Sequence, residues 1–379
     1  AGGMHYTSIE NIHKVIDPLF LDDLKQELAD IKATSVAKTK RDRAIAFKDK
    51  ISKLKFFDPA CGSGNFLTES YTSLRRLENE ALRIIYGDNR VIGELADPIK
   101  VSINQFYGIE INDFACSVAQ TALWIAEAQM MQETDEIVGF SLDPLPLKTY
   151  TNVHEGNALR MDWNEVVPAA ELDYIMGNPP FVGARLMDKA QKDDINHIFA
   201  GWKNAGNLDY VCCWYKKAAD IMQNTAIRTA LVSTNSVSQG ESVANLWKPL
   251  FADGVHIDFA YRTFRWDSEA KSKAHVHCVI IGFSTAVNPA ERRIYSSERY
   301  QVAKNINGYL LDGDNVFIES RNKPLCNVPE IGMGNQPIDN GQYLFEEDEM
   351  DAFIKTGPLS AGFFHPWYGA KEFISRKPR

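Results

Sequence analysis

The chain has 379 residues, of which 45% are hydrophobic and 24% are charged, and its net charge is -9. This composition is typical of an ordinary globular protein, and the net charge argues against a protein that binds polyanions through its overall charge. No apolar stretch reaches the roughly 20 residues that a membrane-spanning helix needs. The six cysteines form no C-x-x-C pair. We therefore expect a cytoplasmic protein with reduced thiols, no membrane association and no metal site.

The first predicted element is a helix over residues 7–31, where Thr7 and Glu10 have the spacing of a capping box. The basic stretch KTKRDRAIAFKDKISKLK follows at residues 38–55. Two interpretations of this stretch remain open: a patch that contacts a nucleic-acid backbone, or the solvated face of a helix. A second group of positive residues comprises Arg262, Arg265, Lys271 and Lys273.

Strands and helices alternate through the middle of the chain. The predicted strands have the sequences KLKFFD, QFYGIE, LDYIMG, RTALVST, VHIDFAYR and VHCVIIGFS, and the predicted helices cover residues 65–86, 113–131, 208–223 and 242–252. This alternation predicts an α/β fold with a mostly parallel sheet, helices on both faces and an antiparallel pair at its end. After about residue 285, Gly, Pro and Asn interrupt the pattern, which indicates a linker to a smaller region.

Polar motifs follow the predicted strands. In DPACGSGNF, Gly62 and Gly64 allow a tight turn and close approach to a ligand. The dinucleotide fingerprint requires a third glycine where this chain has Leu67, so a ligand with less phosphate and more apolar surface fits better. Glu110 ends the next strand, where a carboxylate can accept both hydroxyls of a ribose.

Two further motifs lie after later strands. The amide of Asn157, in HEGNALRMDW, can pair with an adenine. Asn178 follows an apolar strand that two prolines end at once. Each motif alone also fits an ordinary turn or surface residue, but the carboxyl ends of parallel strands share one crevice. The order of the motifs therefore predicts one ligand site.

The stretches DPACGSGNF, GIEIN, GNALRMDW and GNPPFVG, preceded by GMHYTS, resemble the gamma-class S-adenosylmethionine-dependent N6-adenine DNA methyltransferases. The resemblance is to the methyltransferase part of large single-chain, type IIG-like restriction–modification enzymes. It covers residues 4–285 well and residues 286–379 loosely. It implies a Rossmann-like class I methyltransferase fold with a seven-stranded, mostly parallel sheet. The implied domains are an N-terminal helical segment (1–55), a catalytic domain (56–285), a linker (286–330) and a partial target recognition domain (331–379).

The resemblance implies S-adenosylmethionine as the cofactor. Thr7 would help to bind its methionine carboxylate, and Glu110 would hold its ribose. Asn157, where many relatives have Asp, would contact its adenine, on which Phe66 or Phe114 would pack. The implied cofactor residues are Thr7, Asp58, Pro59, Ala60, Gly62, Gly64, Phe66, Glu110, Ile111, Asn157, Ala158 and Asn178.

The implied catalytic residues are Asn178, Pro179, Pro180 and Phe181. The Asn178 side-chain oxygen and the Pro179 carbonyl would accept the two hydrogens of an adenine amino group and free its lone pair. Phe181 would stack on a base that has left double-stranded DNA. No metal or covalent intermediate is needed. The resemblance and the start at Ala1 without a methionine indicate a piece of a longer chain that carries a nuclease and a full recognition domain.

Alternative functions remain open. The acceptor of the methyl group can instead be cytosine N4, RNA or a protein, or the chain can be a non-catalytic DNA-binding subunit of a restriction complex. Glu269-x-Lys271 with Asp258 upstream matches a metal-dependent nuclease pattern loosely, but it falls in a segment that the methyltransferase resemblance already explains. The DNA target sequence is not encoded in a recognizable motif.

Overall fold

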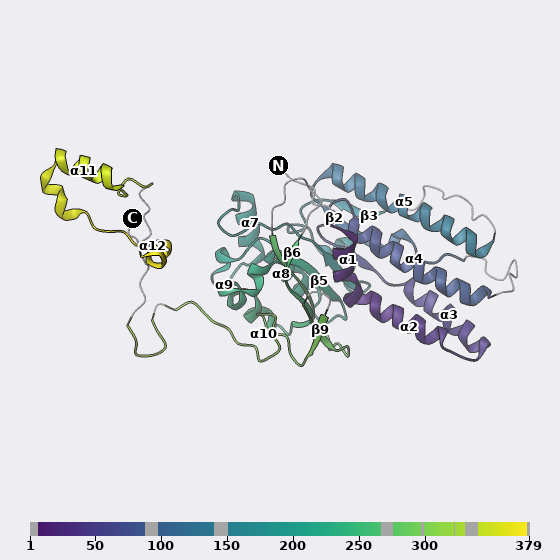
Figure 1. The fold of residues 1–379 in the computed structure, drawn as a ribbon. Helices are drawn as coiled ribbons and strands as arrows, with labels where there is room; N and C mark the ends of the chain where they lie inside the picture. The colour runs from purple at the N-terminus through teal and green to yellow at the C-terminus, as the bar shows by residue number, and fades with distance from the viewer. Residues whose placement is uncertain are drawn as a thin grey trace. The chain divides into compact units, whose positions relative to one another are not determined.

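The computed structural model describes residues 7–87, 98–139, 151–266, 276–296, 299–321, 323–329 and 340–376. The chain forms two compact units, Ala1–Glu319 and Ser320–Arg379. The first unit holds the sheet and nearly all of the helices (Figure 1). The second contains α11 (Glu347–Thr356), a 3-10 turn (Pro358–Phe363) and α12 (Ala370–Ser375).

The sheet has nine strands in the order β3-β2-β1-β4-β5-β7-β6-β8-β9. Their bounds are β1 Phe56–Asp58, β2 Phe106–Glu110, β3 Asn152–Glu155, β4 Tyr174–Gly177, β5 Arg228–Thr234, β6 His256–Trp266, β7 Val276–Ser284, β8 Arg292–Ser296 and β9 Arg299–Ala303. Strands β1 to β5 pair in parallel, and β7 is antiparallel to both β5 and β6. The predicted α/β class with helices around a mixed sheet is confirmed.

The sheet is two strands wider than the seven that we expected. Strands β8 and β9 come from the segment that we interpreted as a linker, and β8 pairs in parallel with β6. The reason is packing that the local sequence pattern does not show. Ile294 is buried, and the Tyr295 ring stacks on Tyr261 with centroids 4.2 Å apart.

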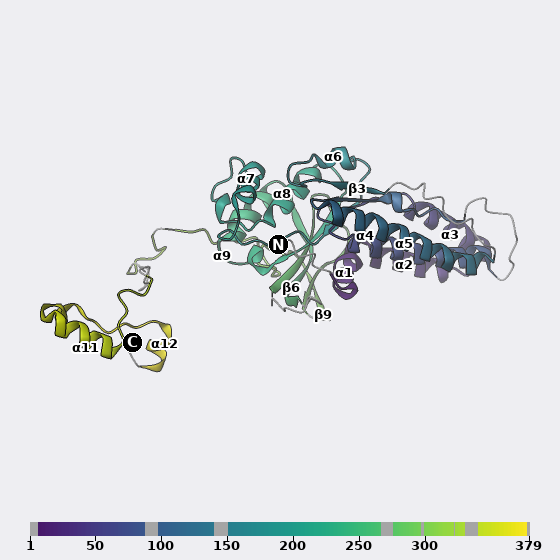
Figure 2. The ribbon, with the colours of Figure 1, turned by 90° about the horizontal axis from the view of Figure 1, so that it is seen from above.

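Helices cover both faces of the sheet. The remaining helices are α1 Ile9–Ile16, α2 Asp22–Lys32, α3 Ala37–Ile51, α4 Asn65–Tyr86, α5 Asp113–Val138, α6 Trp163–Val166, α7 Lys189–Ile198, α8 Cys212–Ile221, α9 Gly240–Ser242 and α10 Lys248–Ala252. The long helices α2 to α5 lie side by side in both views (Figures 1 and 2). Within the described ranges, no helix is both long and apolar enough to cross a membrane.

The strands point alternate side chains into two cores. Phe56 and Met176 join α1, α4 and α5 in one cluster, whereas Phe57 and Ile175 join α8 and the turn at Val243–Trp247 in the other. This period of two is what buries a central strand on both faces. All six cysteines lie in described ranges and none forms a disulfide.

The first predicted helix is interrupted and lacks the expected capping box. A π-helical turn at Asp17–Leu21, which contains Pro18, separates α1 from α2. Proline has no N–H and therefore cannot continue the regular pattern of helical hydrogen bonds. Ser8, not Thr7, is the N-cap residue of α1, and it forms no side-chain cap bond. Thr7 is buried and serves a different contact, described below.

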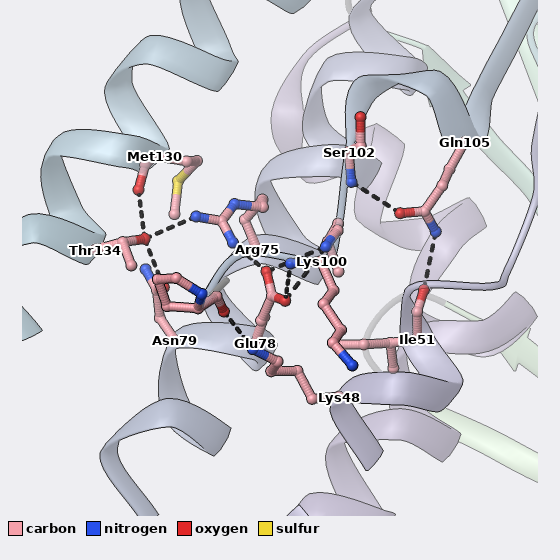
Figure 3. A network of polar contacts seen from close by, with 12 residues as sticks. Lys48, Ile51, Arg75, Glu78, Asn79, Lys100, Ser102, Gln105, Met130 and Thr134 are labelled. Atoms are coloured by element: carbon pink, nitrogen blue, oxygen red, sulfur yellow. Dashed lines mark hydrogen bonds and ion pairs between the residues drawn. The ribbon is translucent and has the colours of Figure 1, made fainter. Parts of the chain in front are cut away.

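A buried polar network ties α3, α4 and α5 to the chain that enters β2 (Figure 3). Arg75 and Glu78 form an ion pair with fully buried side chains. Glu78 also accepts hydrogen bonds from the backbone N–H groups of Lys100 (2.7 Å) and Val101 (3.2 Å). Arg75 reaches Thr134 of α5 at 2.7 Å. The network thus anchors the segment that precedes the Glu110 strand.

Candidate functional site

The turns after β1, β2 and β3 are linked to one another at the carboxyl edge of the sheet. The Cys61 N–H donates to the Ile109 carbonyl at 3.0 Å, and the Gly156 N–H donates to the Glu110 carbonyl at 2.8 Å. These bonds join the motifs DPACGSGNF, GIEIN and GNALRMDW, which are far apart in the sequence. The structure therefore brings the predicted cofactor residues of these motifs to one edge.

Two glycines shape the turn between β1 and α4. Gly62 has φ +55° and Gly64 has φ +81°, a region that favours glycine. A Cβ atom at Gly64 would also lie 2.9 Å from the Ala119 Cβ atom. The turn holds Glu110, whose carboxylate accepts from the Gly62 N–H at 2.9 Å and from the Asn112 N–H at 2.9 Å. Glu110 is thereby fixed beside the glycine turn.

Asp58, the last residue of β1, is a buried carboxyl with one unpaired oxygen. Its Oδ1 accepts from the Ala60 N–H at 3.0 Å, but Oδ2 has no hydrogen-bond partner among the described residues. Burial, and secondly the charge of Glu110, raise the pKa of Asp58 to about 8. A Cβ atom at Gly177 would lie 2.5 Å from Asp58 Oδ1. Asp58 therefore fits only because β4 ends in glycine.

Asn178 lies directly after Gly177 and contacts the N-terminal segment. Its Nδ2 donates to Thr7 Oγ1 at 3.3 Å, whereas its buried Oδ1 has no hydrogen-bond partner within the described residues. Pro179 is buried, and Phe181 is half-buried and packs against both cores. No peptide bond in the described part of the chain is cis. Because a buried polar atom without a partner is costly, the unpaired acceptor at Asn178 marks this turn as a candidate ligand contact.

The aromatic candidates differ in exposure. Phe66 is 3% exposed and belongs to the core beneath α4, so it does not offer a ring face to a ligand. Phe114, at the start of α5, is 64% exposed, and Ile111 is 68% exposed. Ile111 directly follows Glu110 in the sequence, and Phe114 follows four residues after Glu110. Of the two rings that we considered, Phe114 is the one placed at the surface.

Asn157 is engaged inside the protein. Its Oδ1 accepts from the Leu159 N–H at 2.9 Å, and its Nδ2 donates to Asp194 Oδ2 at 3.2 Å. Asp194 also accepts from Tyr210 and Arg160. Although burial opposes it, these hydrogen bonds keep the pKa of Asp194 below its ordinary value. The carboxylate orients the Asn157 amide, which retains a second N–H for other partners.

Sequence reasoning missed several residues that brace these turns. They are Asp194 on α7 and four residues in or just before α8, namely Asp209, Tyr210, Trp214 and Lys217. One feature of the sequence could have pointed to Lys217. It lies one turn after Cys213 and Trp214 on a predicted helix with an apolar face. A lysine at such a position requires hydrogen-bond partners inside the protein.

Comparison with known proteins identifies the family. The family described as "MmeI, DNA-methyltransferase domain" matches residues 34–296. The chain belongs to this MmeI DNA-methyltransferase family. The resemblance to restriction–modification methyltransferases is thus confirmed. The "MmeI, target recognition domain" family matches residues 312–379.

Individual relatives of this MmeI-family chain agree with the assignment. "DNA methyltransferase A" of Bacillus subtilis (strain 168) is 42% identical over 98% of the chain and 42% of the relative. The solved structure of the type IIL restriction–modification enzyme MmeI in complex with DNA has a TM-score of 0.90 and 41% identity, over 99% of this chain and 50% of that one. The chain thus spans half or less of the length of these two relatives.

The family assignment also bears on the remaining predictions. A DNA-methyltransferase family uses a methyl-donor cofactor, so this part of the cofactor prediction is supported. Of the nuclease-like residues, Glu269 and Lys271 lie outside the described residues, whereas Asp258 is buried and accepts from Ser284 at 2.8 Å. The described residues contain no group of three His, Cys, Asp or Glu side chains that could hold a metal.

Proposed function

We propose that this chain is the methyltransferase part of a restriction–modification enzyme that methylates adenine N6 in double-stranded DNA with S-adenosylmethionine. The unpaired Asn178 Oδ1, at the edge that also holds Asp58 and Glu110, carries this proposal. The relative MmeI, which was solved with DNA, supports the choice of substrate. The nuclease and the complete recognition domain would lie in the rest of the parent chain. Residues 56–285 would form the catalytic domain, and residues 331–379 would begin target recognition.

The residues at the sheet edge fit the proposed cofactor. The Glu110 carboxylate is a suitable acceptor for two ribose hydroxyls. The unpaired Asp58 Oδ2 can take one further hydrogen-bond partner, and the exposed Ile111 and Phe114 side chains suit a flat apolar ring. Thr7, Gly62 and Gly64 complete the set. When bound, S-adenosylmethionine supplies an electrophilic methyl group.

The Asn178 turn would activate the amino group of the target base. An adenine amino nitrogen is a poor nucleophile because its lone pair is delocalised into the ring. Asn178 Oδ1 and the Pro179 carbonyl are two acceptors for its two hydrogens, and they draw the nitrogen toward tetrahedral geometry. Pro179 and Pro180 have no N–H, so they place no competing donor beside it. Catalysis then rests on positioning and charge stabilisation.

Methylation of DNA by the full-length parent protein tests this proposal. After incubation with S-adenosylmethionine, mass spectrometry of the digested DNA should identify N6-methyladenine. Asn178→Ala should abolish the product and leave cofactor binding nearly intact, because Asn178 acts on the nucleophile. Asn104→Ala, an exposed asparagine away from the turn, serves as the control. N4-methylcytosine, no DNA product, or a fully active Asn178→Ala protein would contradict the proposal.

Phe181 tests the role of base stacking. Loss of a stacking platform costs about 1–3 kcal/mol per base, so Phe181→Ala should weaken binding of the extruded adenine more than it slows methyl transfer. Phe181→Trp keeps an aromatic face and should retain much of the activity. Equal losses in both variants would indicate that Phe181 only packs against the two cores.

A further inference from the structure

Helix α8 and the three residues before it contact the segments that follow β1, β3 and β4 in the candidate site. Tyr210, Trp214 and Lys217 recur at helical spacing, and Asp209 immediately precedes them. We call these four residues the α8 frame. The Trp214 Nε1–H donates to the Pro59 carbonyl at 3.2 Å, which fixes the turn after β1.

Asp209 serves the turn that carries Asn178. Its Oδ1 accepts from the Ala184 N–H at 3.1 Å, in the segment that follows Phe181. Its Oδ2 accepts from the Ser236 hydroxyl and, at 3.5 Å, from Thr234 at the end of β5. One carboxylate therefore joins the segment after Asn178 to the neighbouring strand. The backbone N–H of the next residue, Tyr210, donates to the Val182 carbonyl at 2.9 Å. This bond attaches the residues just before α8 to the same segment after Asn178.

Tyr210 and Lys217 serve the turn that carries Asn157. The Tyr210 hydroxyl donates to Asp194 at 2.8 Å, and Asp194 in turn accepts from the Asn157 amide. Lys217 Nζ donates to the carbonyls of Ala158 at 2.8 Å and Met161 at 2.5 Å. The Asn157 amide and the carbonyls of Ala158 and Met161 are thus hydrogen-bonded to residues of α7 or α8.

We propose that Asp209 and Tyr210 are positioning residues for methyl transfer: Asp209 sets the target-base turn, and Tyr210, through Asp194, sets the cofactor turn. Neither needs to touch the reacting atoms. The two residues are adjacent, yet their side chains hold different turns, so their loss should affect different steps. This assignment rests on the proposed function above, but the bonds themselves belong to the protein alone.

Steady-state and single-turnover assays of methylation by the full-length protein distinguish the role of Asp209 from that of Tyr210. Because a displaced turn of about 1 Å costs on the order of 100-fold in rate, Asp209→Ala should lower kcat by about this factor. Its Kd for S-adenosylmethionine should stay unchanged. Tyr210→Phe removes a bond to a charged group and should raise that Kd about tenfold, with little change in kcat. Asp209→Asn keeps an oxygen for the Ala184 N–H and should restore most of the lost rate.

Asp220→Ala is the matched control, since the exposed Asp220 lies on α8 and forms its ion pair in the described structure with Lys216. It should leave both constants unchanged. If Asp209→Ala does not fold, Asp209→Glu replaces it, because the longer side chain keeps the charge but moves the turn. A wild-type kcat in the folded Asp209 variant, or a raised Kd there in place of a lowered kcat, would overturn the assignment.

Amide hydrogen exchange gives a readout that does not depend on catalysis. In protein without DNA or cofactor, Asp209→Ala should speed exchange in the peptide that contains Val182–Leu186, and Asp220→Ala should not. If the wild-type protein methylates no DNA but exchange responds as expected, the proposed function fails and the positioning role of Asp209 stands. If wild-type methylation occurs and neither exchange nor kcat responds, only the positioning role fails.

Discussion

The Thr7 hydroxyl and the Asn178 amide, 171 residues apart in the chain, are joined by a hydrogen bond of 3.3 Å. The bond turns the Asn178 Nδ2 group toward the N-terminal segment and leaves Oδ1 without a partner in the described structure. A residue that we predicted to bind the cofactor thus orients the residue that we predicted to act on the base. The N-terminal segment therefore contributes a side chain to the candidate site.

Thr7→Val should lower kcat/KM, because it leaves the half-buried Asn178 amide without its acceptor. An unsatisfied donor costs about 1–3 kcal/mol, which corresponds to roughly a 5- to 150-fold loss. Thr7→Ser keeps the hydroxyl and should retain most of the activity. Ser8→Ala is the matched control, since Ser8 forms no side-chain cap bond. Methylation assays that found Thr7→Val as active as Ser8→Ala would remove Thr7 from the site.

Glu110→Ala should weaken binding of S-adenosylmethionine. The carboxylate already accepts two backbone N–H groups, so the variant loses both a ligand contact and a brace for the Gly62 turn. Charge-assisted hydrogen bonds contribute about 1.5–3 kcal/mol, and calorimetry should show a loss of this size. Glu155→Ala, at the exposed end of β3, is the comparison variant. Undiminished affinity in Glu110→Ala would exclude it from the cofactor site.

Asp58 should make the free protein less stable as the pH rises. Its pKa is raised to about 8 by burial, so the folded state holds a proton that the unfolded chain releases above its ordinary pKa near 4. This stabilisation is complete below pH 4 and is lost as the pH rises through 8, by at most about 1.4 kcal/mol per pH unit. Urea unfolding at pH 6 and pH 8.5 should show a smaller decrease for Asp58→Asn than for the wild type. Parallel decreases would mean that Asp58 is ionised throughout.

The basic residues of α3 should contribute little to DNA binding. Arg41 Nε donates to the Ile85 carbonyl at 3.3 Å, Arg43 donates to Thr34 at 2.7 Å, and Lys48 is buried. These internal contacts favour the interpretation of this stretch as a helix face that stabilises the bundle. Neutral replacements of Lys38, Lys40, Arg41 and Arg43 should leave the salt dependence of DNA binding unchanged. A slope that decreased by about 0.9 per replaced residue would instead indicate phosphate contacts.

Glu78→Ala should strongly destabilise the protein. The change leaves Arg75 as a buried charge without its partner and frees two backbone N–H groups of the chain that enters β2. Breaking a buried pair by removing one partner costs about 3–5 kcal/mol. Glu80→Ala, on the exposed side of the same helix, should cost less than about 1 kcal/mol. Denaturant unfolding of both variants measures the difference, and equal midpoints would show that the network adds no stability.

The order of strands and helices could be predicted because it follows from local periodicity. Successive residues such as Phe56 and Phe57 point to opposite cores, so both are apolar. The motif residues at the strand ends could likewise be predicted, because parallel strands present their carboxyl ends together. Strand β8 could not, since its place beside β6 depends on the Tyr261–Tyr295 stack between distant residues.

The contacts that support the candidate site could not be predicted from the sequence, because they too depend on packing between distant residues. Asp209 and Tyr210 resemble any polar pair at the start of a helix until the segment after Phe181 is folded against them. Phe66 and Phe114 could not be distinguished either, because only tertiary packing buries one ring and exposes the other. Local pattern thus suggests candidate ligand contacts at the strand ends, whereas the residues that hold these turns in place become visible only in the folded structure.

The position of β1 between β2 and β4 has a consequence for synthesis on the ribosome. The chain produces β1 early, but its neighbour β4, beginning at Tyr174, emerges only after β2 and β3 have been translated. Before β4 pairs, β1 lacks its neighbour on that side, and an Asp58 carboxyl in contact with water would be ionised at neutral pH. The arrival of Gly177 covers this carboxyl, and the carboxyl takes up a proton from the solvent at neutral pH because its pKa rises to about 8. In this order of events, the carboxyl would gain its proton only when β4 completes the centre of the sheet.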